Sequence, residues 1–170
     1  KTLGKKSAAY IANLNNQAKL SQSLGKYNEA EKEFDEALKL AEQEFGDGMH
    51  MAILLNNKAM LFLSVGRYGE AAELMKKAMT SATKGAKKLF QSFDNRKFQV
   101  NLAFIYQLSG KYAEAETNFL EIKKVFENKK QTGNAEYAGL LNQLGILYIQ
   151  MGKNDKVEEL FKKSKEIYKT

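Results

Sequence analysis

The sequence has no cysteine and no proline, and each absence removes a class of structure. Without cysteine there can be no disulfide and no thiolate metal site. This leaves the compartment open, because a cysteine-free chain tolerates either redox state. Proline makes up about 5% of an average protein, and without it nothing forces a break inside a long helix.

Patterns of enzymatic chemistry are scarce as well. His50 is the only histidine. A Ser-His-Asp triad would therefore depend on this one residue, and a metal site at His50 would have no second histidine ligand. The phosphate-binding patterns GxxxxGK[ST] and GxGxxG do not occur. No stretch approaches the roughly 20 apolar residues of a membrane-spanning helix, and residues 1–6 are not followed by a signal-peptide core. We therefore expect no catalysis, cofactor or metal in this segment.

One sequence motif occurs four times. It consists of an apolar helix that ends in Gly, then a cation, then a second helix with regularly spaced Ala residues. The copies occupy 20–34, 61–75, 105–119 and 147–161. Their glycines are Gly25, Gly66, Gly110 and Gly152, which are 41, 44 and 42 residues apart. A repeat of this regularity predicts a stack of equivalent units, and such stacks more often build binding surfaces than catalytic sites.

Each copy resolves into two amphipathic helices. In the first copy, Leu14, Ala18 and Ser21 form one helical stripe, and Gly25 suits the left-handed turn at a helix end. A second helix is expected at 27–45. The later helices are expected near 50–65, 68–83, 94–109, 112–128, 135–151 and 154–169. No run alternates with period two, so the class is all-α. The distance from Gly85 to Gly110 exceeds that from Gly4 to Gly25 by about one helical turn. This predicts an added turn or a bulged entry to the first helix of the third unit.

Small residues recur at fixed positions of both helices, and large ones recur beside them. The small set is Ala18, Ala59, Ala103 and Gly145 in the first helix, with Ala30, Ala71 and Ala115 in the second. The large set is Phe34, Met75, Phe119 and Phe161. This alternation lets helix backbones approach closely while the core stays filled, as a stacked hairpin requires.

These residues resemble the tetratricopeptide repeat (TPR) family, in the version of about 42 residues found in kinesin light chains and in bacterial multi-repeat proteins. The first-helix matches are LNNQAKL (14–20), LLNNKAMLF (54–62) and LLNQLGILYIQMGK (140–153). GKYNEAEKEFDEALKL (25–40) and GRYGEAAELMKKAM (66–79) resemble the second helix. The resemblance implies one domain, a right-handed α-α superhelix of about four hairpins. Its repeats would span 5–46, 47–85, 86–130 and 131–170, with 1–4 as the tail of a preceding repeat in a longer protein.

The resemblance also implies a concave groove lined by the first helices, and hence an adaptor that binds a protein or peptide partner. The groove set is Asn15, Lys19, Asn56, Asn57, Met60, Lys97, Asn101, Phe104, Asn142 and Ile146, flanked by Gln22, Ile53, Leu63, Val100, Gln107 and Ile149. Its asparagines could bond a peptide backbone or could bond only the neighbouring unit. Only Asn57 and Lys97 match the family's carboxylate-binding set. We therefore expect an extended or helical peptide with one or two apolar anchors.

The charge of +7 is uneven and offers a second hypothesis. Lys84, Lys87, Lys88, Arg96 and Lys97 form a basic patch interleaved with Phe90, Phe93 and Phe98. Such a patch could bind nucleic acid or another anionic partner. The simpler interpretation is a solvated helix face whose phenylalanines enter the core. A third hypothesis is a structural repeat that self-associates as a spacer, in a chain that is otherwise a monomer.

Overall fold

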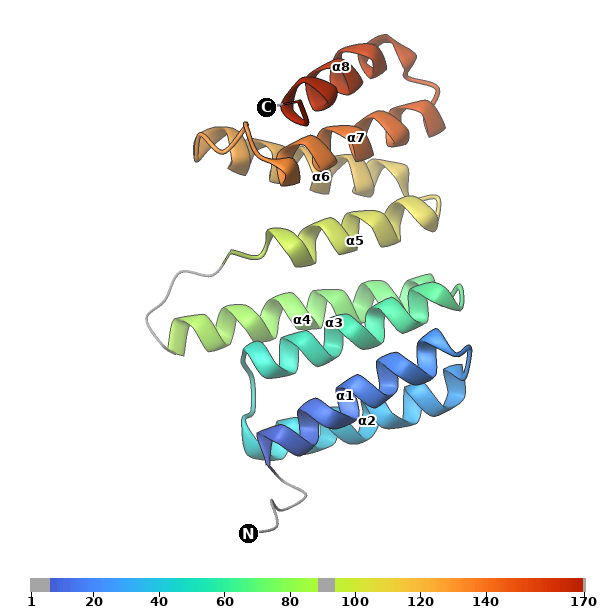
Figure 1. Ribbon diagram of the computed structural model, residues 1–170, viewed down its shortest axis with the longest axis vertical. Coiled ribbons are helices and arrows are strands. Elements are labelled where there is room, and N and C mark those ends of the chain that lie inside the picture. The colour runs from blue at the N-terminus through green and yellow to red at the C-terminus, as the bar shows by residue number, and fades with distance from the viewer. Residues whose placement is uncertain (1–6, 89–93, 170) are drawn as a thin grey trace. The chain divides into compact units, whose positions relative to one another are not determined.

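The computed structural model describes residues 7–88 and 94–169, without the side chains of Lys87 and Lys88. These residues form helices and no strand, which confirms the all-α repeat fold (Figure 1). The elements are α1 (Ala8–Ser23), α2 (Tyr27–Glu44), α3 (Met49–Ser64), α4 (Tyr68–Lys88), α5 (Arg96–Leu108), α6 (Tyr112–Asn128), α7 (Ala135–Gln150), the 3₁₀ turn η1 (Asn154–Lys156) and α8 (Val157–Ile167).

The helices group into two compact units, Lys1–Phe98 and Gln99–Thr170. In the first unit α1 packs on α2, α3 packs on α4, and α2 and α3 join the two hairpins. In the second unit α6 packs on α7 and α7 packs on α8. Ala103 of α5 shares a buried cluster with Ala115 and Phe119 of α6. Each unit therefore stacks two helical hairpins around its own core.

The four turn glycines have the predicted conformation. Their φ angles lie between 72° and 77°, in the left-handed region that an L side chain rarely adopts. The residue after each glycine donates its backbone N–H to a carbonyl five residues back, as Lys26 does to Ser21 at 2.8 Å and Arg67 to Phe62 at 2.8 Å. This bond closes the end of each first helix and sets where the second begins.

The alternation of small and large residues is confirmed in the core. Ala18, Ala30, Ala59, Ala71, Ala103 and Ala115 are fully buried, as are Phe34, Met75 and Phe119. In the fourth hairpin a Cβ atom added at Gly145 would overlap the ring of Phe161. Glycine stands there because the ring occupies the space that an alanine methyl group fills in the other hairpins.

The extra residues lengthen α4 and do not add a turn to α5, while the stretch where a bulged entry would fall, 89–93, lies outside the described residues. Helix α4 continues to Lys88 instead of ending near 83, and α5 begins at Arg96. Gly85 lies inside α4, where a Cβ atom would come within 2.6 Å of the Cα of Gly48. Ser81 fixes the same contact, since its Oγ accepts from the Gly48 N–H at 3.0 Å. Gly85 therefore allows close packing and does not end a helix.

The last helix also differs from its expected range of 154–169. It opens with η1, and its α-helical part runs over Val157–Ile167. Ser164 is its buried residue, held by a hydrogen bond from its Oγ to the Ala138 carbonyl at 2.8 Å. Where the other hairpins have alanine, the last one thus has a half-buried Val157 and a buried, hydrogen-bonded Ser164.

Candidate functional site

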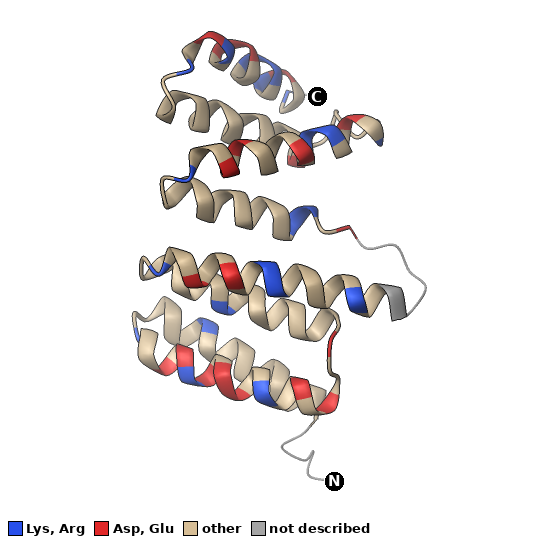
Figure 2. Ribbon diagram, turned by 180° about the vertical axis from the view of Figure 1, so that it is seen from behind, with Lys and Arg blue, Asp and Glu red and all other residues tan. Residues whose placement is uncertain are grey.

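The first and second helices of the hairpins differ sharply in charge. In α1 the charged residue is Lys19, in α3 it is Lys58, and in α7 it is Glu136. By contrast α2 carries Glu29, Glu31, Lys32, Glu33, Asp35, Glu36, Lys39, Glu42 and Glu44. In the first unit α1 and α3 lie on one side (Figure 1), and α2 and α4, which carry most of its charged residues, lie on the other (Figure 2). The first-helix side is thus a nearly uncharged surface.

Asparagine amides connect the two first helices of the first unit. Asn57 Nδ2 donates to Asn15 Oδ1 at 2.8 Å, and Asn56 Nδ2 donates to Asn57 Oδ1 at 3.1 Å. All three side chains are half-buried. Asn57 and Asn15 therefore bond the neighbouring hairpin, while the Asn15 amide N–H groups have no hydrogen-bond partner within the described part of the chain.

Two further polar pairs join successive first helices. Gln22 Nε2 donates to Ser64 Oγ at 3.4 Å in the first unit. Gln107 Nε2 donates to Gln150 Oε1 at 2.7 Å in the second. Both Gln107 and Leu63 are buried, so the expectation that they line an open surface was wrong. Gln107 instead joins α5 to α7 through its bond to Gln150.

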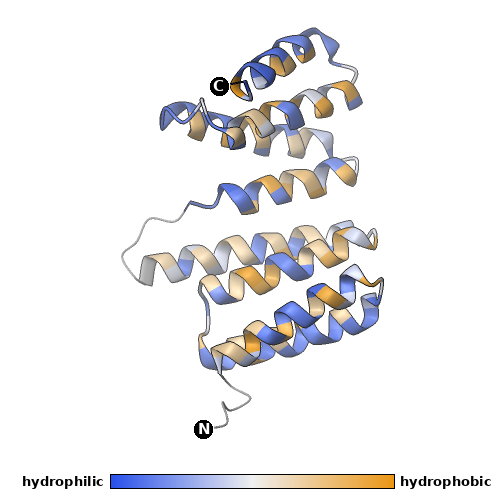
Figure 3. Ribbon diagram, in the orientation of Figure 1, coloured by the Kyte–Doolittle hydropathy of each residue, from blue (hydrophilic) through white to orange (hydrophobic). Residues whose placement is uncertain are grey.

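Exposed apolar side chains flank the amides. Ile53 of α3 is 45% exposed, and Ile146 and Ile149 of α7 are exposed as well. Met60 and Phe104 are half-buried, and Lys19 and Asn142 are exposed. Figure 3 shows that α3 and α7 are the most hydrophobic helices of their hairpins. An apolar anchor of a ligand would find partners on both.

The predicted groove residues divide between the two units. Asn15, Lys19, Asn56, Asn57, Met60 and Lys97 belong to the first unit. Asn101, Phe104, Asn142 and Ile146 belong to the second. The candidate site therefore comprises two surfaces, one on α1 and α3 and the other on α5 and α7.

The basic patch is partly neutralised. Lys84 Nζ lies 3.0 Å from Asp47 Oδ2, and hydrogen bonds from Lys84 and Ser81 lower the pKa of the Asp47 carboxyl. Arg96 donates to both carboxylate oxygens of Asp94 at 2.6–2.9 Å. Phe98 is buried, which agrees with the simpler interpretation for this ring. The side chains of Lys87 and Lys88, and all of Phe90 and Phe93, lie outside the described residues.

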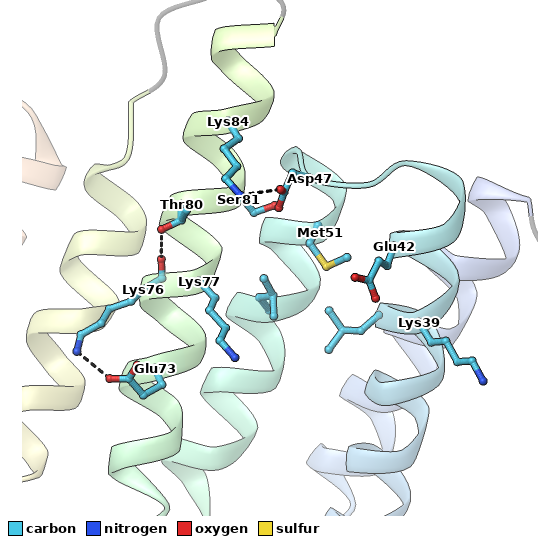
Figure 4. A pocket seen from close by; sticks show the side chains of 12 residues that line it. Lys39, Glu42, Asp47, Met51, Glu73, Lys76, Lys77, Thr80, Ser81 and Lys84 are labelled. Carbon is cyan, nitrogen blue, oxygen red and sulfur yellow. Dashed lines mark hydrogen bonds and ion pairs between the residues drawn. The ribbon is translucent and has the colours of Figure 1, made fainter.

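An open pocket of about 600 Å³ lies on the other side of the first unit, between α2 and α4 over α3 (Figure 4). Leu38, Met51 and Leu55 are apolar parts of its lining. The Lys76–Glu73 pair at 2.8 Å and the Lys84–Asp47 pair stand at its rim. Helical periodicity could not indicate this pocket, because its polar lining residues look like an ordinary solvated face.

Signs of catalysis or membrane insertion are missing from the described helices and loops. Over residues 7–86 and 94–169 no three His, Cys, Asp or Glu side chains come together as metal ligands would. The ring of His50 stacks on Phe45 with centroids 4.8 Å apart. None of the described helices has the length and apolar character needed to cross a bilayer.

Comparison with known proteins identifies the repeat. The model of the tetratricopeptide repeat family matches residues 10–84 and 96–170. Among solved structures, the nearly identical TPR-like repeats of a kinesin light chain-like protein from Podosopora anserina superpose with a TM-score of 0.80 at 18% identity, over 98% of this chain and 79% of that one. BtubC (BKLC) from P. vanneervenii gives 0.79 at 25% identity, over 94% of this chain and 62% of that one. MamA gives 0.67 at 14% identity, over 94% and 78%. No curated protein sequence matches.

Proposed function

The chain belongs to the tetratricopeptide repeat family, and from this premise we propose that it is an adaptor whose first-helix surfaces bind a peptide segment of a protein partner. The proposal adds a surface and a ligand class to a fold that serves generally as a scaffold for protein interaction. It assigns recognition to this segment and no chemical step.

The observation that carries the proposal is the composition of the first-helix surface. On α1 and α3 it combines half-buried amides (Asn15, Asn56) with exposed or half-buried apolar side chains (Ile53, Met60), and the exposed charge of these two helices is Lys19. Amides offer both donors and acceptors to a peptide backbone. Apolar side chains offer area to an anchor residue. The outer face of the second helix α2 is instead covered largely by charged side chains.

The same composition defines the ligand. A carboxylate or phosphate ligand needs several converging cations, and α1 and α3 supply one exposed lysine and one lysine, Lys58, that is buried and paired with Asp35. We therefore expect an internal segment, extended or helical, that places one or two apolar side chains against Ile53 and Met60 or against Phe104 and Ile146.

The test is affinity capture from nuclease-treated lysate of the source organism, using Ile53→Ser, Ile146→Ser and the double variant Asn56→Ala/Asn101→Ala. Capture of the partner should fall with each of these while helicity by circular dichroism stays unchanged. Leu120→Ser is the matched control, because Leu120 is similarly exposed at 42% but lies on the second helix α6. It should capture the partner as the wild type does.

Two outcomes would contradict the proposal. Equal loss in the control and the test variants would mean that capture depends on general surface hydrophobicity. Capture that survives all the test variants, or that occurs only without nuclease, would favour the basic patch and an anionic ligand instead.

A further inference from the structure

The pocket between α2 and α4 stands where the second unit has a buried tyrosine. Aligned on the turn glycines, α2, α3 and α4 correspond to α6, α7 and α8, so that Met51 corresponds to Tyr137 and Leu55 to Leu141. Tyr137 and Leu141 are both 0% exposed. Met51 and Leu55 are only half-buried and line the pocket. The position that carries a buried ring in the second unit therefore opens to solvent in the first.

The tyrosine of the second unit is held by one acid and one cation. The Tyr137 hydroxyl donates to Glu127 Oε1 of α6 at 3.0 Å, and Lys163 Nζ of α8 lies over the ring, 5.7 Å from its centroid. A cation at this distance is attracted by the negative face of an aromatic ring, and the hydroxyl of a buried tyrosine needs an acceptor. The two second helices thus hold both the ring and the hydroxyl of one side chain.

The first unit keeps the acid and the cation of this arrangement but not the tyrosine. Glu42 of α2 corresponds to Glu127, and Lys77 of α4 corresponds to Lys163. Both line the pocket, and their side chains extend from opposite walls toward α3 between them (Figure 4). Neither side chain has an ion pair or hydrogen bond with any residue that the structure describes. The two groups that hold a tyrosine in the second unit are therefore available here.

Two further replacements keep the pocket open and apolar. Tyr137 packs against Phe126 with ring centroids 5.6 Å apart, and the residue of α2 that corresponds to Phe126 is Ala41. Lys123 pairs with Glu127 at 2.6 Å, and its place on α2 is taken by Leu38. The first unit thus lacks two aromatic rings at these positions, and it has an apolar wall where the second unit has a cation.

We propose that this pocket binds a tyrosine side chain presented by a peptide segment of a protein partner. The ring would lie on Met51 and Leu55 beside the ammonium group of Lys77, and its hydroxyl would donate to the carboxylate of Glu42. Tyrosine is the occupant because the corresponding acid and cation of the second unit hold one. The pocket lies on the other side of the unit from the α1 and α3 surface, so the inference does not depend on the proposed function. The protein would then hold two segments at once.

The first experiment measures which side chain the pocket prefers. The probe is a short acetylated and amidated peptide with one tyrosine among alanines and serines, and matched peptides carry phenylalanine or leucine in its place. NMR titration gives the dissociation constants. The tyrosine peptide should bind about three- to tenfold more tightly than the phenylalanine peptide, which lacks the hydrogen bond. Phenylalanine should exceed leucine by about two- to fivefold, because leucine offers no ring to the cation. Equal affinity for the three peptides overturns the proposal.

Single substitutions assign each part of this preference to a residue. Glu42→Ala should abolish the preference for tyrosine over phenylalanine and leave the phenylalanine peptide's affinity unchanged. Lys77→Ala should weaken both aromatic peptides by about two- to fivefold and leave the leucine peptide unchanged. Glu44→Ala is the matched control, because Glu44 is an exposed acid of α2 outside the pocket lining, and it should change nothing. Ile53→Ser should also change nothing, and a loss of tyrosine binding with it would place the peptide on the α1 and α3 surface and refute the pocket.

A second experiment fills the pocket from within. Met51→Tyr supplies the side chain that the second unit has, so the variant should melt above the wild type and should no longer bind the tyrosine peptide. Adding Glu42→Ala should lower the melting temperature more in this variant than in the wild type, because the new hydroxyl loses its acceptor. A Met51→Tyr variant that binds the peptide as the wild type does contradicts the proposal. Sedimentation of the wild type tests another occupant, since a dimer that Met51→Tyr abolishes would assign the pocket to a second copy instead of a partner.

Discussion

Single amide side chains set how successive hairpins meet. Asn57 reaches from α3 to α1 and bonds Asn15 at 2.8 Å, while its own oxygen accepts from Asn56. Gln107 and Gln150 repeat the arrangement between α5 and α7 at 2.7 Å. These residues lie on the surface where the sequence predicts ligand contacts. Part of the predicted amide row is therefore committed to contacts between successive hairpins.

Asn57→Ala measures how much the hydrogen bond between Asn57 and Asn15 contributes to the free energy of unfolding. The substitution removes a donor and an acceptor from a half-buried pair and leaves Asn15 without its partner. We expect the free energy of unfolding to fall by about 0.5–1.5 kcal/mol. Urea denaturation followed by circular dichroism gives the value. Asn16→Ala is the control, because Asn16 is an exposed neighbour on α1 and its loss should cost less. Equal effects of the two substitutions would show that the bond adds nothing to stability.

At the scale of the helix, the pairing of a small residue with a large one decides how tightly a hairpin closes. Three hairpins combine alanine in the first helix with Phe34, Met75 or Phe119 in the second. The fourth combines Gly145 with Phe161, whose ring fills the place of the methyl group. Helix propensity alone would favour alanine at position 145 by about 1 kcal/mol. The packing of α7 on α8 favours glycine at position 145 instead, because the Phe161 ring occupies the space of a methyl group.

Gly145→Ala tests which effect prevails. The new methyl group must displace the Phe161 ring, so we expect the variant to lose about 1–3 kcal/mol of stability despite its better helix propensity. The double variant Gly145→Ala/Phe161→Leu should recover part of this loss, because leucine leaves room for the methyl group. Thermal melting of the single variants Gly145→Ala and Phe161→Leu and of the double variant gives the coupling. A Gly145→Ala variant that melts above the wild type would mean that the ring moves away at little cost.

The elements differ in how far the sequence could predict them. Gly25 and Gly152 end first helices as expected, because the cation and the apolar stripe around them repeat four times. Gly85 belongs to no repeated phrase, and its role depends on the backbone of Gly48, which is distant in sequence. The same limit applies to the site. Helical spacing placed Ile53 and Ile146 on exposed faces, but it could not show that Leu63 and Gln107 are buried.

At the scale of the whole molecule, charge is separated by surface. The first helices present amides and apolar groups, the second helices carry most of the acids, and the cations of the basic patch are partly held by Asp47 and Asp94. The first-helix surfaces therefore carry few charges that could attract a charged ligand from a distance. Binding there should depend on buried apolar area and on hydrogen bonds to the ligand backbone.

Salt dependence therefore separates a peptide adaptor from a binder of anionic polymers. Once a partner is captured, its dissociation constant should change by less than about threefold when sodium chloride rises fourfold, because few charges take part. A nucleic acid held by all five cations of the basic patch would release about one counterion per contact. Its affinity would then fall by about two to three orders of magnitude over the same range. Lys84→Glu/Arg96→Glu provides the matched variant, because both residues belong to the basic patch and neither belongs to the predicted groove set. It should leave the affinity for the partner unchanged, whereas a large loss with this variant, together with a steep salt slope, would place the ligand on the basic patch.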